Sequence, residues 1–592
     1  MVKQINKNLD YVPKLGRSSF DMSKDIKFTS SVGHLLPVYW DILNDGDKVK
    51  IGASIFTRTK PLATPAFVSI EEHVDYFFVP FRQLYRFFDN KRTDINLLNT
   101  TLVEELRQTV NLPTLNLETL ASWFKNRFHD EQEAERSLIE NFGIPYWMDF
   151  LRLIDLLGIN YKPIYDYIVG NTDTLKMAYV PTSFMSGINV FPFLAYQKIF
   201  YDHYRNDEFT PNNPEAYNAD NFETNSFDSS NDELVRLHFA PWKRDFFTNI
   251  RSSPLVSSLN SLGLTFQLKD YPNINSLINY QSSVTGNSGG LTSNPNFPLN
   301  LVAASGPQSG NLNAIRAMYA YDKLLRITQF APKDVDAQIA AHFGWKVPQG
   351  VEGRVVYLGS DDSRIDIGEV AATSDTLSSD GSTGAQLGAL AGKGAGYREG
   401  KAIHDFTAPC SGILMAVYSA VPTADYQNNF DKLLMYIDIN NYYRPEFENL
   451  GMQPLFASQL QISSNSDTIP TDNCILGFQY RWSELKQKFS SIHGDFLDTL
   501  PDWVVNRNKQ SMTQPNTNPS INYSWLYCNP CAIDSITEVN FAPTQVFPDP
   551  PLPPSPDQWD DTVFTRDPLM HWITFHSYKT STMSMYDLPF NF

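Results

Sequence analysis

Near the N-terminus, apolar and polar positions alternate with a period of two. In Lys48–Thr59, valine, isoleucine or alanine stands at every second position, and this alternation predicts a half-buried strand. The NDGD sequence at Asn44–Asp47 predicts a tight turn before it, so His34–Leu43 is expected to be the preceding strand. Val68–Val79 predicts a third strand, which stops at Pro80 because proline cannot continue a hydrogen-bonded ladder.

The middle of the chain changes to a helical period. Leu117, Leu120, Ala121 and Phe124 stand at i, i+3, i+4 and i+7, which is the spacing of one helix face. Gly158 and Gly344 are expected to stop two of the helices, because glycine favours the left-handed conformation at a helix C-terminus. Five helices are predicted: Leu117–Phe128, Phe150–Leu157, Phe193–Arg205, Ala314–Leu325 and Asp334–Phe343.

The C-terminal third returns to short apolar runs between turn signals, which predict strands. The proline-rich segment Pro548–Asp561 is expected to run extended in the polyproline II conformation, as an arm lying across a surface. Its P-x-x-P spacing leaves an SH3 ligand as the less favoured alternative. The strands predicted here are Gly412–Val421, Leu433–Tyr443, Ile475–Trp482 and Trp572–Tyr578.

Three long stretches between these elements have no hydrophobic period. Asn206–Asn231 and Ser282–Asn313 are rich in Asn, Ser, Gly and Pro, and Ala371–Gly400 is rich in Gly, Ser and Ala. Such composition predicts loops. Loops longer than about 15 residues are uncommon in compact domains, so we expect a neighbouring subunit to hold them where they are ordered.

Composition restricts the class of protein. The chain has 592 residues, of which 42% are hydrophobic, 13% aromatic and 19% charged, and its formal net charge is −18. It is too apolar for disorder and too acidic to coat nucleic acid by bulk charge. Four cysteines make no disulfide scaffold, and the N-terminal sequence lacks the apolar run of a secretory signal. The expectation is a soluble protein made in a reducing cytosol, with aromatic surface buried against partners.

The sequence predicts no site for catalysis, a cofactor or a metal. The glycine-rich run Gly388–Lys401 has neither phosphate-loop spacing and is expected to be a loop. Cys528 and Cys531 form one C-x-x-C pair, which is half a zinc site, so a tight turn is favoured. The acidic run Ser360–Glu369 lacks EF-hand spacing and is predicted to be a solvated hairpin.

Histidines are expected to be structural. His571 and His576 are five residues apart, which places them on opposite faces of a strand. His34, His203 and His238 stand beside aromatic residues, where packing is the favoured role. No nucleophile elbow and no H-E-x-x-H motif occurs in the sequence.

Basic residues gather at the N-terminus. Lys3, Lys7, Lys14 and Arg17 occur there with Asp10 as the only acidic residue. These four side chains are the candidate contacts to nucleic-acid phosphates. An ordinary solvated terminus is the alternative, and the residues alone favour it.

Taken in order, several blocks of the sequence resemble the major capsid proteins of microviruses, which are small tailless bacteriophages with single-stranded DNA, and most closely those of the gokushovirus type. No single block is specific, but they follow the family order over nearly the whole chain. The blocks are 18–67, Val74–Tyr85, Phe191–Asp207, Ala240–Asn249, Leu324–Pro348, Tyr442–Gly451, Gly477–Phe496 and Met583–Pro589.

The resemblance implies a mainly β protein with helical insertions, built on a single eight-stranded antiparallel jelly roll. It implies a structural capsid subunit without enzymatic activity, which assembles with itself into a T=1 icosahedral shell around circular single-stranded DNA. It further implies a virion location after assembly in the bacterial cytoplasm. Other implied partners are a small basic DNA-binding virion protein, which the acidic charge also favours, a DNA pilot protein and a host surface receptor.

Surface protrusions in relatives are built from an insertion between strands. The candidates here lie in the two Asn-rich segments and are represented by Asn212, Asn221, Asn287 and Asn294. The expected division of the chain is an N-terminal arm with the first strands, a helical insertion, a variable surface insertion, helices with a glycine-rich loop, and the remaining strands. Its boundaries are 1–95, 96–190, 191–313, 314–410 and 411–592.

One different class of protein stays open at the sequence level. A large β-rich carbohydrate-binding protein or glycoside hydrolase would also be aromatic and acidic. It requires two carboxylates in one aromatic-lined cleft, and the sequence singles out no such pair.

Overall fold

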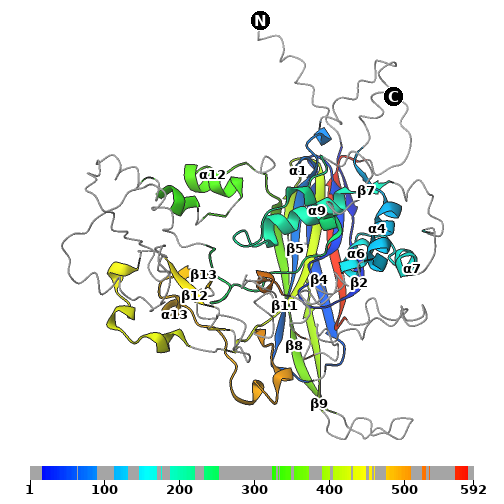
Figure 1. Cartoon of the computed structure of the whole chain (residues 1–592). Helices are drawn as coiled ribbons and strands as arrows, with labels where there is room; N and C mark the ends of the chain where they lie inside the picture. Colours follow the sequence, from blue (N-terminus) through cyan, green and yellow to red (C-terminus); the bar gives the residue numbers. More distant parts are fainter. Residues whose placement is uncertain are drawn as a thin grey trace, which may run out of the picture.

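The fold is taken from a computed structural model of the whole chain (Figure 1). All structural statements concern the residues that it describes. These are 16–62, 64–89, 112–130, 146–169, 175, 187–220, 232–252, 320, 323–328, 331–332, 334–348, 353–371, 390–400, 404–427, 431–448, 452–456, 459–460, 475–507, 523–528, 533, 536 and 567–583.

One large antiparallel sheet forms the body of the described chain, and ten strands take part in it. Its continuous path is β1-β14-β4-β9-β8-β5-β11-β3, while β2 also pairs with β14 and β10 with β4. The strands are β1 (Ser18–Asp21), β2 (Lys24–Ser30), β3 (Leu36–Leu43), β4 (Lys48–Thr59), β5 (Ser69–Pro80), β8 (Val356–Ala371), β9 (Leu390–Arg398), β10 (His404–Thr407), β11 (Gly412–Pro422) and β14 (Leu569–Ser581).

Ten strands occupy eight positions in this sheet. β1 and β2 pair with successive parts of β14, so they act as one interrupted strand. In the same way β9 and β10 pair with the two ends of β4. The fold is therefore mainly β with helical insertions, as predicted, and it is consistent with a capsid-type jelly roll of eight strand positions.

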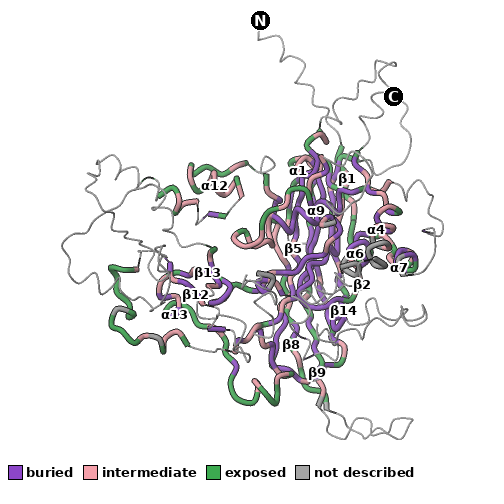
Figure 2. The backbone as a smooth tube through the Cα atoms, in the orientation of Figure 1, coloured by how far each residue is buried: buried purple, intermediate pink, exposed green. Residues whose placement is uncertain are grey.

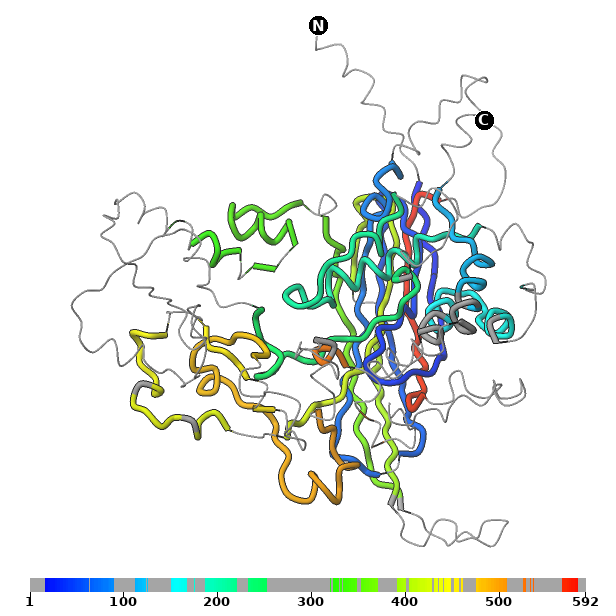
Figure 3. The backbone as a smooth tube through the Cα atoms, in the orientation of Figure 1, coloured from blue at the N-terminus to red at the C-terminus, as the bar shows by residue number. Residues whose placement is uncertain are grey.

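The two ends of the described chain meet in this sheet. The C-terminal strand β14 lies between the N-terminal strands β1 and β2 on one side and β4 on the other. Figure 3 shows the red and blue segments side by side along the length of the sheet. Every second residue of β14 is buried and those between are exposed or half-buried, so one row of side chains points inward and the other outward.

The sheet curls, so that its edge strand β3 faces β14 across the interior. The Tyr39 ring packs on Phe575 with centroids 5.0 Å apart, and the Tyr39 hydroxyl donates to Ser577 Oγ at 3.2 Å. Lys579 of β14 lies 3.3 Å from Asp41 of β3. Figure 2 shows the buried interior that results.

Two buried carboxylates join strands inside the curl. Asp361 of β8 accepts from the Ala53 amide and the Tyr76 hydroxyl, both at 2.8 Å, and from Arg398 at 3.1 Å. Glu72 of β5 accepts from hydroxyls on two other strands, as described below. A buried charge is tolerated only with such partners, so these contacts fix how the strands meet.

Glu72 lies at the centre of a polar network. It accepts from Thr57 Oγ1 at 2.5 Å and from the Tyr418 hydroxyl at 2.7 Å, and His571 Nδ1 is 3.6 Å away. Ser30 Oγ completes the network at 2.8 Å from His571 Nε2. Burial raises the pKa of Glu72, but the adjacent His571 and the two hydroxyls outweigh burial and leave that pKa below its usual value.

Helices cover part of the sheet. The helix α9 continues as a π-helical turn, η2 (Phe200–Tyr204), and every α9 residue is buried. The Trp40 indole of β3 donates to the Leu157 carbonyl just beyond α6 at 3.2 Å. The helices in and beside this body are α1 (Phe81–Leu84), α4 (Leu117–Asp130), α6 (Tyr146–Leu156), α7 (Lys162–Val169) and α9 (Phe191–Ile199), with a short strand pair, β6 (Thr114–Leu115) and β7 (Ile188–Asn189).

A second, smaller apolar cluster lies beside the barrel and includes Phe246, Phe247, Leu455, Leu476 and Trp525. Its frame is the hairpin β12 (Met452–Phe456) and β13 (Ile475–Tyr480), followed by α13 (Ser483–Lys486). In Figure 1 this hairpin and α12 (Val335–Phe343) stand away from the sheet.

Most predicted elements are confirmed. The strands before and after NDGD, the strand ending at Pro80, and the strands at 412–422, 475–480 and 569–581 are present. The helices at 117–130, 146–156 and 191–199 are present, and Gly158 and Gly344 have φ values of 103° and 66°. Residues 320 and 323–328 are helical and overlap the end of the predicted helix Ala314–Leu325, most of whose other residues lie outside the described chain.

Three predictions are wrong in part. Leu433–Tyr443 is not a strand but a series of 3-10 turns. Gly388–Lys401 is not a loop throughout, because Leu390–Arg398 is the strand β9. Ser360–Glu369 lies in a hairpin with β9, but its Asp361 is fully buried rather than solvated.

Close packing explains the glycines of β9. A Cβ on Gly392 would lie 2.1 Å from the Thr64 carbonyl oxygen, and one on Gly396 would lie 2.8 Å from the Arg364 carbonyl oxygen. Neither contact is tolerated, so the strand needs glycine at these positions. Composition alone predicted a loop here, whereas in the structure these glycines allow the strand to pack closely against its neighbours.

Replacing Glu72 with alanine is expected to lower the free energy of unfolding by about 3 kcal/mol, because it leaves buried hydroxyls and His571 without their acceptor. Urea unfolding of the purified chain measures this. Glu71→Ala is the control, since Glu71 pairs with exposed Lys243 at 2.9 Å, and it should cost at most about 0.5 kcal/mol. Equal losses in the two variants would contradict the structural role of Glu72.

The contribution of Glu72 should also depend on pH. Because its folded-state pKa is lowered, the stabilisation is present above the unfolded-state pKa and is lost as the pH falls through the folded-state pKa. Glu72→Gln should therefore cost most near neutral pH and least in acid. Unfolding curves across that range measure the difference, and a cost independent of pH would contradict it.

Candidate assembly surface

Two segments that project from the barrel expose apolar side chains. One contains α12, and the other is Lys432–Glu448, here called the arm. Figure 2 shows both with many exposed residues, in contrast to the buried sheet. Large exposed apolar patches on a soluble chain are typical of contact surfaces.

The helix α12 is well capped at both ends, but it contributes no side chain to a hydrophobic core of the described chain. The Asp334 side chain accepts from the Ala337 amide at 3.0 Å, and Gly344 closes the C-terminus in the left-handed region. No residue of α12 is buried within the described chain. Phe343 is 82% exposed, and Trp345 and Val335 are also exposed. A helix of this length depends on packing for its stability, so a partner surface is expected.

Polar contacts fix where α12 stands. Asp334 lies 3.5 Å from Arg354, and Asp336 accepts from the Gly353 amide at 2.7 Å. Asp202, in the π-helical turn η2 that follows α9, accepts from the Val355 amide at 2.9 Å. The helix is therefore tied to the start of β8 and to the barrel while its apolar face stays exposed.

The arm consists of three 3-10 turns, η6 (Lys432–Met435), η7 (Ile439–Asn441) and η8 (Pro445–Phe447), joined by extended residues. Ile437 is 79% exposed. The other exposed apolar side chains of the arm are Leu434, Ile439, Tyr442, Tyr443 and Phe447.

Contacts to α13 and its neighbours hold the arm in place. The Trp482 indole donates to the Asn441 carbonyl at 2.9 Å, and Lys486 pairs with Glu448 at 2.7 Å. The Tyr443 ring packs edge-on against Trp482 at 5.1 Å. An anchored backbone with outward apolar side chains loses little further chain entropy on binding, which favours association.

Glu484 is the buried anchor below the arm. It accepts from the Tyr436 hydroxyl and from Gln453 at 2.7 Å, and Lys432 lies 3.5 Å away. Burial raises the pKa of Glu484, but the charge of Lys432 and these hydrogen bonds outweigh burial, so its pKa lies below the usual value. Its carboxylate is therefore a structural anion.

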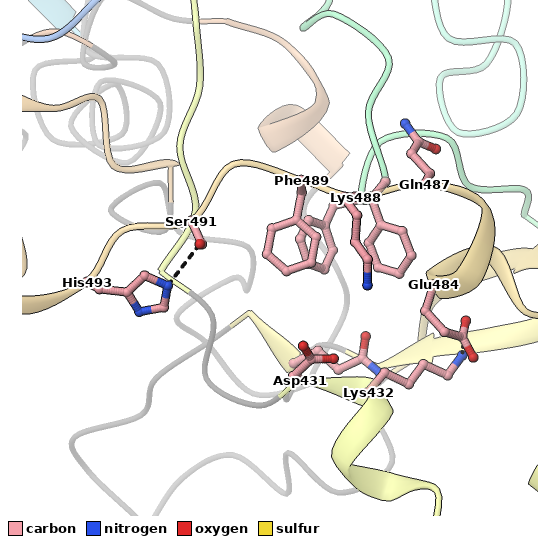
Figure 4. A pocket seen from close by; sticks show the side chains of 11 residues that line it. Asp431, Lys432, Glu484, Gln487, Lys488, Phe489, Ser491 and His493 are labelled. Atoms are coloured by element: carbon pink, nitrogen blue, oxygen red, sulfur yellow. Dashed lines mark hydrogen bonds and ion pairs between the residues drawn. The ribbon is translucent and has the colours of Figure 1, made fainter.

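A cavity of about 290 Å³ opens beside this anchor and is lined by phenylalanines, lysines and carboxylates. In Figure 4 the Lys488 side chain lies beside the Phe489 ring, and Lys432 and Glu484 lie below them. Two carboxylates in an aromatic cavity are what a glycoside hydrolase would require. Such an enzyme needs a general acid with a raised pKa, whereas the pKa of Glu484 is lowered.

The proposed site residues from the sequence are only partly described. Lys3, Lys7 and Lys14 lie outside the described residues, and Arg17 is exposed just before β1. Asn221, Asn287 and Asn294 also lie outside the described residues. Asn212 is exposed and donates to the Tyr217 hydroxyl at 3.1 Å. Their roles as nucleic-acid and protrusion residues stay predictions.

The Asn-rich segment 206–220 packs against the barrel rather than standing clear of it. Ala216 and Ala219 are buried, and the Ala219 amide donates to the Leu84 carbonyl at 2.8 Å. Residues 221–231 and Ser282–Asn313 lie outside the described residues, as do Cys531 and the proline-rich segment Pro548–Asp561.

The predicted roles of the histidines are confirmed where the structure describes them. His571 is buried in the barrel and His576 faces outward. His34 and His238 are buried among aromatic rings, and burial lowers the pKa of each. Burial also lowers the pKa of His203 to about 4.

Among the described residues, no group of three or more His, Cys, Asp or Glu side chains is arranged to hold a metal ion. Across the same part of the chain, no helix is both long and apolar enough to cross a membrane.

Sequence reasoning missed the arm as a surface. It predicted a strand in Leu433–Tyr443 because the run is apolar and aromatic. The available signal was the pair Asn440 and Asn441 with Asp438, which interrupts alternation and favours turns. No strand pairs with this segment in the described chain, and so its apolar side chains stay exposed.

The curled sheet and the exposed apolar segments suit a protein that makes contacts with other copies or partners. Comparison with known sequences agrees: the model of the family described as capsid protein (F protein) matches residues 12–100 and 165–543. The chain belongs to this capsid protein family, and a capsid protein is a structural, non-enzymatic component that assembles into a shell. The predicted resemblance to microvirus capsid proteins is confirmed.

Among characterised proteins, the chain is similar to capsid protein VP1 of Chlamydia phage 1. The two are 24% identical over 248 residues. This match covers 39% of the present chain and 38% of VP1, so it spans well under two thirds of that relative.

Placing a charge on the arm is expected to impair assembly. Ile437→Asp should lower particle yield at least about tenfold, because burying an isoleucine-sized side chain contributes about 1.5–3 kcal/mol. Sedimentation velocity and electron microscopy measure the yield, and circular dichroism checks folding. Val370→Asp, at an exposed position on β8, is the matched control and should assemble normally. Equal yields from both variants would exclude the arm as a contact.

Proposed function

We propose that this chain is the major capsid subunit of a T=1 icosahedral shell that encloses circular single-stranded DNA, assembled in the cytoplasm of a bacterial host. The observation that carries the proposal is the anchored arm with its exposed apolar side chains, since such a surface suits contact between copies. Membership of the capsid protein family supports it, and so does the name of the relative.

DNA contact is proposed to be local and shared. A chain of net charge −18 neutralises phosphate poorly. We therefore assign the phosphate contacts to the basic residues Lys3, Lys7, Lys14 and Arg17, together with a small basic virion protein packaged inside the shell. A DNA pilot protein is proposed as a further virion component.

Host contact is proposed for the Asn-rich segments that contain Asn212, Asn221, Asn287 and Asn294. Deleting Ser282–Asn313 should abolish adsorption to host cells while particles still form. Adsorption assays with purified particles test this proposal. Unchanged adsorption by the deleted particles would refute it.

Assembly itself has a direct test. The full chain, expressed in a bacterium, should form isometric particles whose cryo-EM reconstruction has one copy in each icosahedral asymmetric unit. Particles from an infection should contain nuclease-protected circular single-stranded DNA and a small basic peptide detectable by mass spectrometry. A chain that stays monomeric under all conditions would overturn the proposed function, and particles without that peptide would overturn the proposed partner.

A further inference from the structure

The outward face of the barrel carries a row of rings and cations across four strands. The register places Trp572 of β14 beside Lys27 of β2 on one side and Phe56 of β4 on the other, and Phe56 opposite Tyr397 of β9. Trp572 is 46% exposed and Tyr397 is 68% exposed. Adjacent strands lie about 4.8 Å apart, so the two exposed rings stand about 10 Å apart on one surface.

Cations accompany these rings. The Lys27 ammonium lies 4.9 Å from the centre of the Trp572 ring, and the Arg58 guanidinium lies 4.8 Å from that of Phe56. Arg58 belongs to the next row, between Met570 of β14 and Ala395 of β9. In these two rows the four strands present Lys and Arg but no carboxylate, although the chain as a whole is strongly acidic.

The surface beside the rings is open and polar. The glycines of β9 point inward, so Ala395 and Tyr397 are the outward side chains of β9 in the two rows, and Ala395 is too small to cover them. Asp366 of β8, which follows Ala395 in register, is paired with Arg364 at 2.7 Å. A shallow groove of about 500 Å³ adjoins the row and is lined by Ser54, Tyr397, Glu399, Thr574, His576 and Tyr578.

We propose that this face binds single-stranded nucleic acid, with bases stacked on Trp572 and Tyr397 and with Lys27 and Arg58 contacting phosphates. Exposed rings beside cations are the chemistry that holds an unpaired strand without reading its sequence. The inference rests on the proposed function, because the enclosed genome is the strand available to the shell. It adds a stacking surface to the contacts proposed for the N-terminal residues.

A second copy of the chain fits this face less well. Interfaces between proteins are depleted in lysine. On this face the Lys27 ammonium lies over the Trp572 ring. The arm and α12 expose more large apolar side chains than this face does, which suits contact between copies. The cations and the exposed rings of this face therefore favour single-stranded nucleic acid as its ligand.

The test is a titration of labelled oligothymidylate, about 15 nucleotides long, with the purified full chain, followed by fluorescence anisotropy. Trp572→Ala and Tyr397→Ala should each weaken binding about tenfold, and Trp572→Phe should retain most of it. Lys27→Gln should lower the salt dependence of the binding constant by about 0.7 in the log–log slope. Tyr357→Ala, at a comparably exposed tyrosine of β8, is the control and should bind normally.

Particle yield, measured in parallel, separates this inference from the proposed function. Unchanged oligonucleotide affinity in both alanine variants overturns the stacking surface. If these two variants also fail to form particles, the face is a contact between copies instead. A wild-type chain that assembles but binds no oligonucleotide likewise overturns the stacking surface and leaves the shell standing. A wild-type chain that never assembles overturns the shell instead. In DNA-filled particles, ultraviolet cross-links should map to peptides containing Trp572 or Tyr397.

Discussion

The pairing of β14 with strands from the other end of the chain is the constraint on which the barrel depends. β14 hydrogen-bonds to β1 and β2 along one edge and to β4 along the other. Without it, the N-terminal strands β1 and β2 would have no neighbour in the described sheet, and β3 would have no surface to curl against. Inward side chains of β14 meet both Glu72 and Asp41, so one strand organises the interior as well as the ladder.

The structure divides its polar and apolar groups in a way that suits a subunit. Inside the barrel, buried carboxylates have several donors each, and the strands that meet there are fixed in register. Outside it, the arm and α12 are held by ion pairs and caps while their large apolar side chains face solvent. The barrel therefore holds most of the buried core of the single chain, and the projecting segments present apolar surface that a partner could cover.

Sequence patterns predicted the fold well where the period was clear. The alternation of β4, β5 and β11 and the helical spacing of α4 and α9 are local properties, so one sequence was enough. The strand Leu390–Arg398 was wrongly predicted to be a loop. Its glycines are required by close contacts with Thr64 and Arg364, which are distant in sequence. The prediction of a strand in the arm was wrong. An apolar run indicates that its side chains become buried, but not whether they are buried within the same chain or against another copy. The aromatic row at Trp572 and Tyr397 appears only when the register brings four strands together.

The same strand order has a consequence for synthesis. β14 is made after every other strand of the described sheet, yet it belongs between strands made near the beginning. Contacts of such long sequence separation form slowly and are absent from a nascent chain. A partly translated chain therefore keeps its sheet open on the ribosome, with β4 and β2 unjoined. Synthesis of β14 is therefore the event that allows the barrel to form, and products that stop before β14 lack a finished barrel to contribute to a growing shell.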